Sequence, residues 1–263
     1  AHTDNRELLA ETMRLGHLPG STILGSEHMS KLHKLAEEGK SCIIFSEHVS
    51  NLDVPSMYLR FKDFKDKCFE SIFEKFIFIA GLKLNQTPMV KLYAELFSRI
   101  VIYPIREITK NIGDESKKEE LELANKINYS ATKQIMNLRK KGHIFILYPA
   151  GTRYREWEPE SGMGMKETMA YLGIFDYFCC CSISGNNMPP KEHGDMTNEA
   201  FLEDIIVFNF GEVTETASFV KELTEKHKDT IDKDSARQIQ VDEIMSRIKT
   251  LHDAGDAYRN KLL

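Results

Sequence analysis

The hydrophobic residues of this chain gather in short continuous runs, which alternate with longer segments of mixed polarity. Each run is four to six residues long and rich in isoleucine and phenylalanine or, in one case, cysteine. Runs of this length and composition are typical of strands that are buried on both faces of a sheet. They predict strands at residues 42–45, 76–79, 100–103, 144–148, 178–183 and 205–210.

The segments between these runs carry apolar residues at steps of three and four, which predicts helices with one buried face. We expect helices at residues 52–61, 88–97, 117–141, 164–174 and 235–262. The clearest apolar stripe lies in the third of these and consists of Leu121, Ala124, Ile127, Ala131, Ile135 and Leu138. Before residue 41 the pattern predicts two short helices, separated by a turn at Pro19-Gly20-Ser21.

Strands that alternate with helices favour βαβ units, in which the strands run largely parallel and helices cover both faces of the sheet. The predicted fold class is therefore α/β, with a mixed, largely parallel sheet sandwiched by helices. We expect residues 1–40 to form a short helical N-terminal cover and residues 41–263 to form the α/β domain. Binding sites in such sheets lie at the carboxyl ends of the strands. Residues directly after the predicted strands are thus the first candidates for a site.

Composition narrows the classes of function. The 263 residues carry a net charge of −5, which gives no reason to expect nucleic-acid binding. No apolar run approaches the roughly 18–20 residues that a membrane-spanning helix needs. The five cysteines lack the spacing of metal ligands, which favours a reducing, cytoplasmic location and no bound metal. The sequence has neither a glycine-rich nucleotide loop nor the nucleophile elbow of hydrolases, so we expect no cofactor.

The first candidate site follows the strand predicted at residues 42–45. His48 lies in the turn after that strand, and Asp53 lies five residues later, in the first turn of the next predicted helix. The Asp53 carboxylate can reach back to one ring nitrogen of His48, which fixes the tautomer and leaves the other nitrogen free to take a proton. A histidine and an aspartate at this spacing also occur by chance, and the helix dipole alone favours an aspartate near a helix start.

The second candidate site follows the strand predicted at residues 144–148. Gly151 permits a positive φ or a close backbone approach, and Thr152 belongs to the same supporting turn. Arg153 and Arg155 can present planar donor forks to a phosphate group. The alternative is that each arginine pairs at the surface with one of two nearby carboxylates, Glu156 and Glu158.

The two segments, in this order, resemble two motifs of the glycerolipid acyltransferases. Residues 47–55, Glu-His-Val-Ser-Asn-Leu-Asp-Val-Pro, are similar to the His-x-x-x-x-Asp block of that family. Residues 148–153, Tyr-Pro-Ala-Gly-Thr-Arg, resemble its phosphate-binding Phe-Pro-Glu-Gly-Thr-Arg block, with Ala150 in place of the glutamate. The soluble plastid-type glycerol-3-phosphate acyltransferases also lack that glutamate and carry an Arg-x-Arg pattern, which Arg153 and Arg155 match. Weaker similarity to that branch extends to residues 78–81, 100–106 and 178–190.

This resemblance implies the fold of the glycerol-3-phosphate acyltransferases and an enzyme without a metal or other cofactor. The implied reaction moves a fatty acyl group from a thioester of acyl carrier protein or coenzyme A to the sn-1 hydroxyl of glycerol 3-phosphate. His48 is the implied general base, Asp53 orients it, and the implied phosphate ligands are Arg106, Arg153 and Arg155. We expect these residues to meet at one edge of the sheet. Because the product is amphiphilic, we also expect a weak peripheral contact with membranes.

Two alternatives stay open. Residues 51–55, Asn-Leu-Asp-Val-Pro, are similar to many 1-acylglycerol-3-phosphate acyltransferases, which act on the mono-acylated acceptor. The other alternative is a non-catalytic module that binds phospholipid or phosphate through the same arginines. Glycerol 3-phosphate is favoured as the acceptor by the Arg153-x-Arg155 pattern and by the short, polar segment 1–40.

Overall fold

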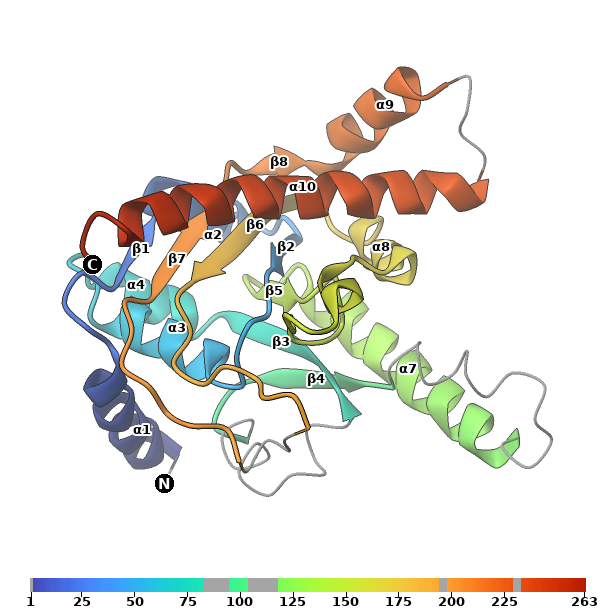
Figure 1. Cartoon of the computed structure of the whole chain (residues 1–263). Coiled ribbons are helices and arrows are strands. Elements are labelled where there is room, and N and C mark those ends of the chain that lie inside the picture. The colour runs from blue at the N-terminus through green and yellow to red at the C-terminus, as the bar shows by residue number, and fades with distance from the viewer. Residues whose placement is uncertain (1, 83–94, 104–117, 194–197, 229–232) are drawn as a thin grey trace.

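The computed structural model describes residues 2–82, 95–103, 118–193, 198–228 and 233–263 (Figure 1). The helices are α1 His2–Gly16, α2 Ser26–Glu37, α3 Asp53–Lys62, α4 Cys68–Phe73, α7 Lys118–Leu138, α8 Met169–Leu172, α9 Thr216–Lys226 and α10 Lys233–Arg259, with short 3-10 helices at Pro159–Gly162 and Lys166–Thr168. The strands are β1 Thr22–Leu24, β2 Cys42–Ser46, β3 Phe76–Gly81, β4 Arg99–Ile102, β5 Ile144–Leu147, β6 Tyr177–Ser184, β7 Val207–Phe210 and β8 Thr214–Glu215.

The described strands form one mixed sheet in the order β1-β7-β6-β2-β5-β3-β4, and β8 pairs with β6 off this path. The strands from β6 to β4 in this order are all parallel. β7 and β8 run antiparallel to β6, and β1 is parallel to β7 at the edge. The predicted α/β class, with a mostly parallel mixed sheet flanked by helices, is therefore confirmed.

Helices cover both faces of the sheet because successive residues of a strand point to opposite sides. In β2, Cys42 and Ile44 join the core cluster that holds the buried residues of α1, α2, α3 and α4. Ile43 and Phe45, which alternate with them, pack with α7, α8, α9 and α10. All five residues of β2 are buried, which explains why the sequence shows a continuous apolar run there rather than an alternating one.

The three consecutive cysteines follow the same rule in β6. Cys179 and Cys181 belong to the first cluster, whereas Cys180 belongs to the second. All three are buried free thiols. Burial raises the pKa of Cys180 to about 12. These cysteines are therefore neutral core residues of the strand.

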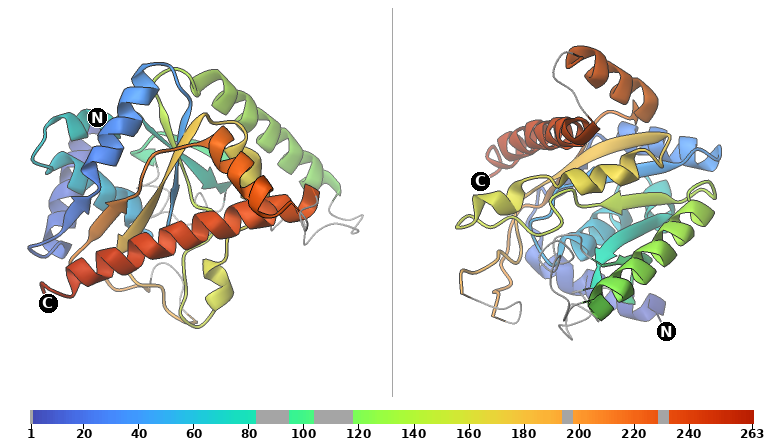
Figure 2. Two further views of the ribbon diagram at one scale, coloured as in Figure 1. Left: turned by 90° about the horizontal axis from the view of Figure 1, so that it is seen from above. Right: turned by 90° about the vertical axis from the view of Figure 1, so that its right-hand side faces the viewer.

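The long helix α10 lies lengthwise along the sheet, over β6 and β7 (Figures 1 and 2). Its buried side chains, Val241, Ile244 and Ile248, pack against the second core cluster. α7 packs beside β4 with Ala131 and Ile135. None of the described helices combines the length and apolarity that crossing a membrane requires.

Every strand predicted from an apolar run is present, with bounds that differ by two residues at most. The helices predicted at 52–61, 117–141 and 235–262 correspond to α3, α7 and α10. The helix predicted at 164–174 is instead a 3-10 turn followed by the short α8. The helix predicted at 88–97 lies mostly outside the described residues. The sequence pattern does not predict α4, β8 or α9.

The N-terminal segment differs from the expectation in one respect. Residues 1–40 contain the two predicted helices, but Thr22–Leu24 between them adds an edge strand to the sheet. The segment is therefore part of the sheet and not only a cover. Three residues are too few to show an alternating pattern, and the strand exists because β7, from far along the chain, supplies its hydrogen-bond partners.

The predicted stripe of α7 offers a test of this packing. Ile135→Ala removes a side chain that is 0% exposed and should lower the free energy of unfolding by about 2–5 kcal/mol. Its neighbour Met136 is 47% exposed, so Met136→Ala should change that free energy by roughly 0.5 kcal/mol or less. Denaturant unfolding of both variants measures the difference. Equal effects would mean that α7 does not pack as described.

Candidate functional site

Three connecting segments meet at the carboxyl edge of the sheet, around the end of β2. β2 lies between β5 and β6 and is parallel to both, so the three strands end on the same side. The segment after β5 touches the segment after β2 directly, because the Tyr154 amide donates a hydrogen bond to the His48 carbonyl at 2.9 Å. The segment after β6 does the same through the Asn186 side chain, which donates to the Val49 carbonyl at 2.9 Å.

His48 is held by Asp53, the first residue of α3. Nδ1 of His48 lies 2.7 Å from Oδ2 of Asp53, and that oxygen also accepts a hydrogen bond from the Val49 amide at 2.9 Å. The Asp53 side chain is 2% exposed and the His48 side chain 20%. Because a carboxylate oxygen accepts, Nδ1 carries the proton and Nε2 is the basic nitrogen. Within the described ranges, Nε2 has no hydrogen-bond partner and is available to take a proton.

Tyr148, the residue directly after β5, covers one face of the imidazole. The rings of His48 and Tyr148 are stacked, with centroids 4.2 Å apart and 20° between their planes. Burial raises the pKa of the Tyr148 hydroxyl well above its usual value, and the negative charge of Asp53 raises it further. The hydroxyl is therefore neutral, and no described residue hydrogen-bonds to it. Tyr148 thus restrains the plane of the His48 ring by packing rather than by charge.

Arg153 is buried and bound to Glu199, a residue of the segment between β6 and β7. Its two terminal nitrogens donate to the two carboxylate oxygens of Glu199 at 2.7 and 2.8 Å. Only 9% of the Arg153 side chain and 3% of the Glu199 side chain are exposed. The pair is therefore a bidentate ion pair that water hardly reaches.

Arg155 lies in a more open position. It donates one hydrogen bond to Glu158 at 2.7 Å and one to the Thr152 hydroxyl at 3.2 Å. Its side chain is 31% exposed and that of Glu158 is 53% exposed. Exposed ion pairs of this kind contribute only about 0–1 kcal/mol, so the Arg155 fork can exchange Glu158 for another anion at little cost.

Gly151 makes the turn between β5 and the two arginines. Its φ is +64°, which confirms the predicted positive φ. Its amide donates a hydrogen bond to the Tyr148 carbonyl at 2.9 Å and closes the turn. A Cβ at this position would collide with the Met165 methyl group. Glycine is thus favoured here chiefly by the backbone conformation, because the Met165 methyl group is the end of a flexible side chain that can shift.

Glu47 connects the end of β2 to α10. Its Oε2 accepts a hydrogen bond from the Ile183 amide at 3.0 Å and lies 2.8 Å from Nδ1 of His252. The other ring nitrogen of His252 lies 3.3 Å from Asp256. The hydrogen bond to Glu47, together with the negative charges of Glu47, Asp256 and Asp253, raises the pKa of His252 to about 8. At neutral pH, His252 is therefore mostly protonated and holds α10 to the residue before His48.

The structure brings most of the predicted site residues together. His48 and Asp53 are in direct contact. Arg153 and Arg155 flank Tyr154, whose amide is bonded to His48, so their backbones lie within a few ångströms of the His48 turn. Arg106, the third predicted phosphate ligand, lies outside the described residues. Of the two arginines, Arg155 forms the surface pair with Glu158 that the sequence offered as the alternative to phosphate binding.

Three contacts of this site are missing from the sequence prediction: the Tyr148 stack, the Glu199 carboxylate and the Glu47–His252 pair. Glu199 and His252 lie far along the chain from their partners, and an isolated glutamate or histidine carries no signal of such a contact. Tyr148 stands inside the predicted segment, at the end of its strand. The position of Tyr148 directly after β5 was the one signal in the sequence for its contact with His48, because β5 lies beside β2 and both strands end at the same edge.

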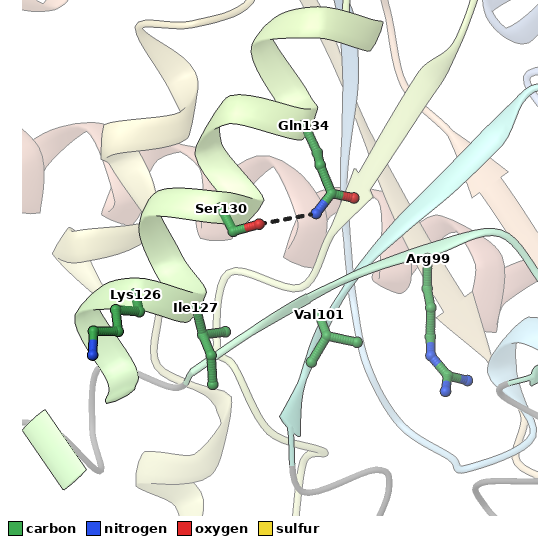
Figure 3. Close-up of a pocket in the computed structure, with 6 residues that line it drawn as sticks. All are labelled: Arg99, Val101, Lys126, Ile127, Ser130 and Gln134. Carbon is green, nitrogen blue, oxygen red and sulfur yellow. Dashed lines mark hydrogen bonds between the residues drawn. The ribbon is translucent and has the colours of Figure 1, made fainter. Parts of the chain in front are cut away.

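A pocket lies away from His48, between β4 and α7. This open pocket has a volume of about 440 Å³ and is lined by Arg99, Val101, Lys126, Ile127, Ser130 and Gln134 (Figure 3). β4 is the third strand from β2 in the sheet, which places it roughly 14 Å from the end of β2 at ordinary strand spacing. None of the residues that line it is a histidine, aspartate or glutamate, so this pocket lacks the base and the carboxylate that are present at the His48 edge.

The described part of the chain contains no cluster of histidine, cysteine, aspartate and glutamate side chains that could hold a metal ion. The groups described at the candidate site are the basic nitrogen of His48, the buried carboxylates of Asp53 and Glu199, and the two arginines. Such a set can remove a proton from a hydroxyl and bind an anion beside it.

No protein-family model matches this chain, and a search of curated proteins finds no match. The resemblance to the glycerolipid acyltransferases therefore depends on the sequence motifs alone.

The turn at Gly151 predicts a clear loss of stability on substitution. Gly151→Ala forces a Cβ into a left-handed backbone and against Met165, and should lower the free energy of unfolding by about 1 kcal/mol or more. Gly173→Ala is the control, because Gly173 has a φ of −67° and no atom lies within 4 Å of the place that its Cβ would take. Thermal unfolding of both variants compares them. A Gly151 variant as stable as the Gly173 variant would contradict the strained turn.

The Glu47–His252 pair predicts a dependence of stability on pH. The pKa of His252 is raised from 6.5 to about 8 in the folded protein, so its contribution is fully present below pH 6.5 and is lost as the pH rises through 8. His252→Gln keeps a hydrogen-bond donor but removes the charge. It should be less stable than the wild type by at most about 2 kcal/mol at pH 6, and the gap should shrink above pH 9.

Denaturant unfolding at pH 6, 7.5 and 9.5 measures this gap. A constant difference between the two proteins across that range would mean that the charge of His252 does not contribute.

Proposed function

We propose that the protein is an acyltransferase that moves a fatty acyl group from an acyl thioester to the sn-1 hydroxyl of glycerol 3-phosphate. The donor is a thioester of acyl carrier protein or of coenzyme A. The observation that carries this proposal is the His48–Asp53 pair at 2.7 Å, which leaves Nε2 as the basic nitrogen in a turn that is hydrogen-bonded to the turn with two arginines. The two sequence motifs and their order along the chain support the same reaction.

The chemical step needs a base and a fixed geometry. Nε2 of His48 takes the proton of the acceptor hydroxyl, and the hydroxyl oxygen attacks the carbonyl carbon of the thioester. The C–S bond then breaks, and the leaving thiolate receives the proton from His48. Asp53 holds the ring through Nδ1 and stabilises the imidazolium that forms during the step. The acyl group passes directly to the acceptor, so no acyl-enzyme is formed.

The positive charge for the acceptor phosphate comes from the turn after β5. Arg155 supplies the accessible fork, because its partner Glu158 is exposed and weakly held. Arg153, whose charge is paired with Glu199, holds the turn in place, and Thr152 supports the Arg155 side chain through its hydroxyl. Arg106 remains a third candidate ligand from outside the described residues. A phosphate held here leaves the first hydroxyl of glycerol 3-phosphate near His48.

We also propose a weak peripheral contact with membranes, where an amphiphilic product would leave. The arginine turn and the segment that follows it expose three large apolar side chains, Tyr154, Trp157 and Met163, by 44%, 40% and 59%. Flotation with phospholipid vesicles tests this contact, and absence of the protein from the vesicle fraction would contradict it.

The proposed chemistry is tested by thiol release from a long-chain acyl thioester. The wild type should release thiol only when an acceptor is present, and EDTA should leave the rate unchanged. His48→Ala should lower kcat by about 10²–10⁴, the usual contribution of a positioned general base. Asp53→Asn, which keeps the volume of a side chain that is 2% exposed, should also lower kcat because the imidazolium loses its charge partner.

The control for these variants is the unfolding midpoint, which must stay above the assay temperature. Turnover by folded His48→Ala at the wild-type rate would remove His48 from the mechanism. A wild type that binds phosphate but releases no acceptor-dependent thiol from either donor would favour the non-catalytic module. Faster acylation of 1-acylglycerol 3-phosphate than of glycerol 3-phosphate would change the acceptor and leave the roles of His48 and Asp53 unchanged.

A further inference from the structure

The two arginines of the turn differ in what they are bound to. Arg153 is 9% exposed and holds a carboxylate that is 3% exposed, whereas Arg155 is 31% exposed and holds one that is 53% exposed. The Arg153–Glu199 contact is also bidentate, with both oxygens of Glu199 engaged. The first pair is therefore built into the fold, and the second lies at its surface.

Glu199 has another partner in the candidate site. Its Oε2 also accepts a hydrogen bond from Nδ2 of Asn51 at 3.2 Å. Asn51 stands between His48 and Asp53 in the sequence, in the turn that positions both of them. One carboxylate thus joins the turn after β2, the turn after β5 and the segment between β6 and β7.

An acceptor phosphate would have to displace Glu199 to bind both terminal nitrogens of Arg153. Displacement of Glu199 from Arg153 would leave a buried carboxylate without its cation. It would also break the hydrogen bond between Glu199 and Asn51. Leaving one partner of a buried ion pair uncompensated is strongly unfavourable and offsets the gain from the two new charge-assisted hydrogen bonds. Arg155 offers the phosphate a fork without that cost.

We propose that Glu199 is a positioning residue of this site, and that Arg153 stays bound to it when the acceptor is present. Through Arg153 and Asn51, Glu199 fixes the turn that carries His48 against the turn that carries Arg155. The phosphate binds directly to Arg155, while Arg153 acts through the position of that turn. This inference depends on the proposed function, because the alignment matters only when His48 and Arg155 hold one substrate.

The opposite role for Glu199 makes the opposite prediction. If its carboxylate merely occupied the place of the phosphate, then Glu199→Gln would free Arg153 and tighten the binding of phosphate. As a positioning residue, its loss should weaken the binding of glycerol 3-phosphate and lower kcat. A misplacement of about 1 Å between a base and its substrate can cost roughly 10²-fold in rate, which is the size of effect that we expect for kcat.

The experiment compares Glu199→Gln, Arg153→Gln and the double variant with the wild type. We expect each single variant and the double variant to lower kcat to a similar extent, because each change breaks the same contact. The matched control is Glu158→Gln, which removes the exposed partner of Arg155 and should leave kcat within a few-fold of the wild type. Calorimetric titration with inorganic phosphate and with glycerol 3-phosphate measures the binding of the same proteins.

Tighter phosphate binding by Glu199→Gln would overturn the proposal, and so would losses that add fully in the double variant. The thermal unfolding midpoints of the four proteins, measured without any ligand, separate this outcome from a failure of the proposed function. If even the wild type neither binds phosphate nor turns over an acyl thioester, the acyltransferase proposal fails. The unfolding data alone then decide whether Glu199 links the turns. A non-additive loss of stability would then support Glu199 as the link between the turns, and an additive one would contradict it.

Discussion

The arrangement of the candidate site depends on one constraint, the placement of β2 between β5 and β6 and parallel to both. Parallel neighbours end on the same side of a sheet, so the segments that leave these strands must share one edge. The Tyr154–His48 backbone hydrogen bond and the Asn186–Val49 contact follow from that geometry. A strand that was antiparallel to β2 at either side would carry its following residues to the far edge.

Two buried carboxylates at this edge are each held by hydrogen-bonding partners. Asp53 is bound by His48 and the Val49 amide within one turn, whereas Glu199 is bound by Arg153 and Asn51 and so connects three segments. A buried carboxylate without a partner would be expensive in free energy, so these contacts keep the residues in a defined relation. The Arg155–Glu158 pair differs from these contacts because both of its side chains are partly exposed, so Arg155 can exchange Glu158 for another anion. The two arginines of one short turn therefore have different physical roles: Arg153 belongs to a buried ion pair, and Arg155 to an exposed one.

The basic nitrogen of His48 is oriented by contacts of three kinds. A hydrogen bond to Asp53 fixes the tautomer, the stacked ring of Tyr148 restrains the plane, and the residue before it is tied to α10 through Glu47 and His252. These contacts engage Nδ1, one face of the ring and the neighbouring residue, and within the described residues Nε2 has no hydrogen-bond partner, which agrees with a role for Nε2 as a base.

Local patterns in the sequence were sufficient to predict the strands β2 to β7, the largest helices and the α/β class, because continuous apolar runs and three- and four-residue steps are local signals of burial. β2, for example, is predicted as residues 42–45 and found as Cys42–Ser46, since both of its faces are buried. The His48–Asp53 contact could also be predicted from the sequence, because two side chains that are five residues apart across the start of a helix have few possible relative positions. The edge strand β1 and the partners Glu199 and His252 depend instead on how the chain folds in three dimensions. Each of them acquires its role from a residue far along the chain, and a single polar side chain or a three-residue strand has no local periodicity that could indicate such a partner.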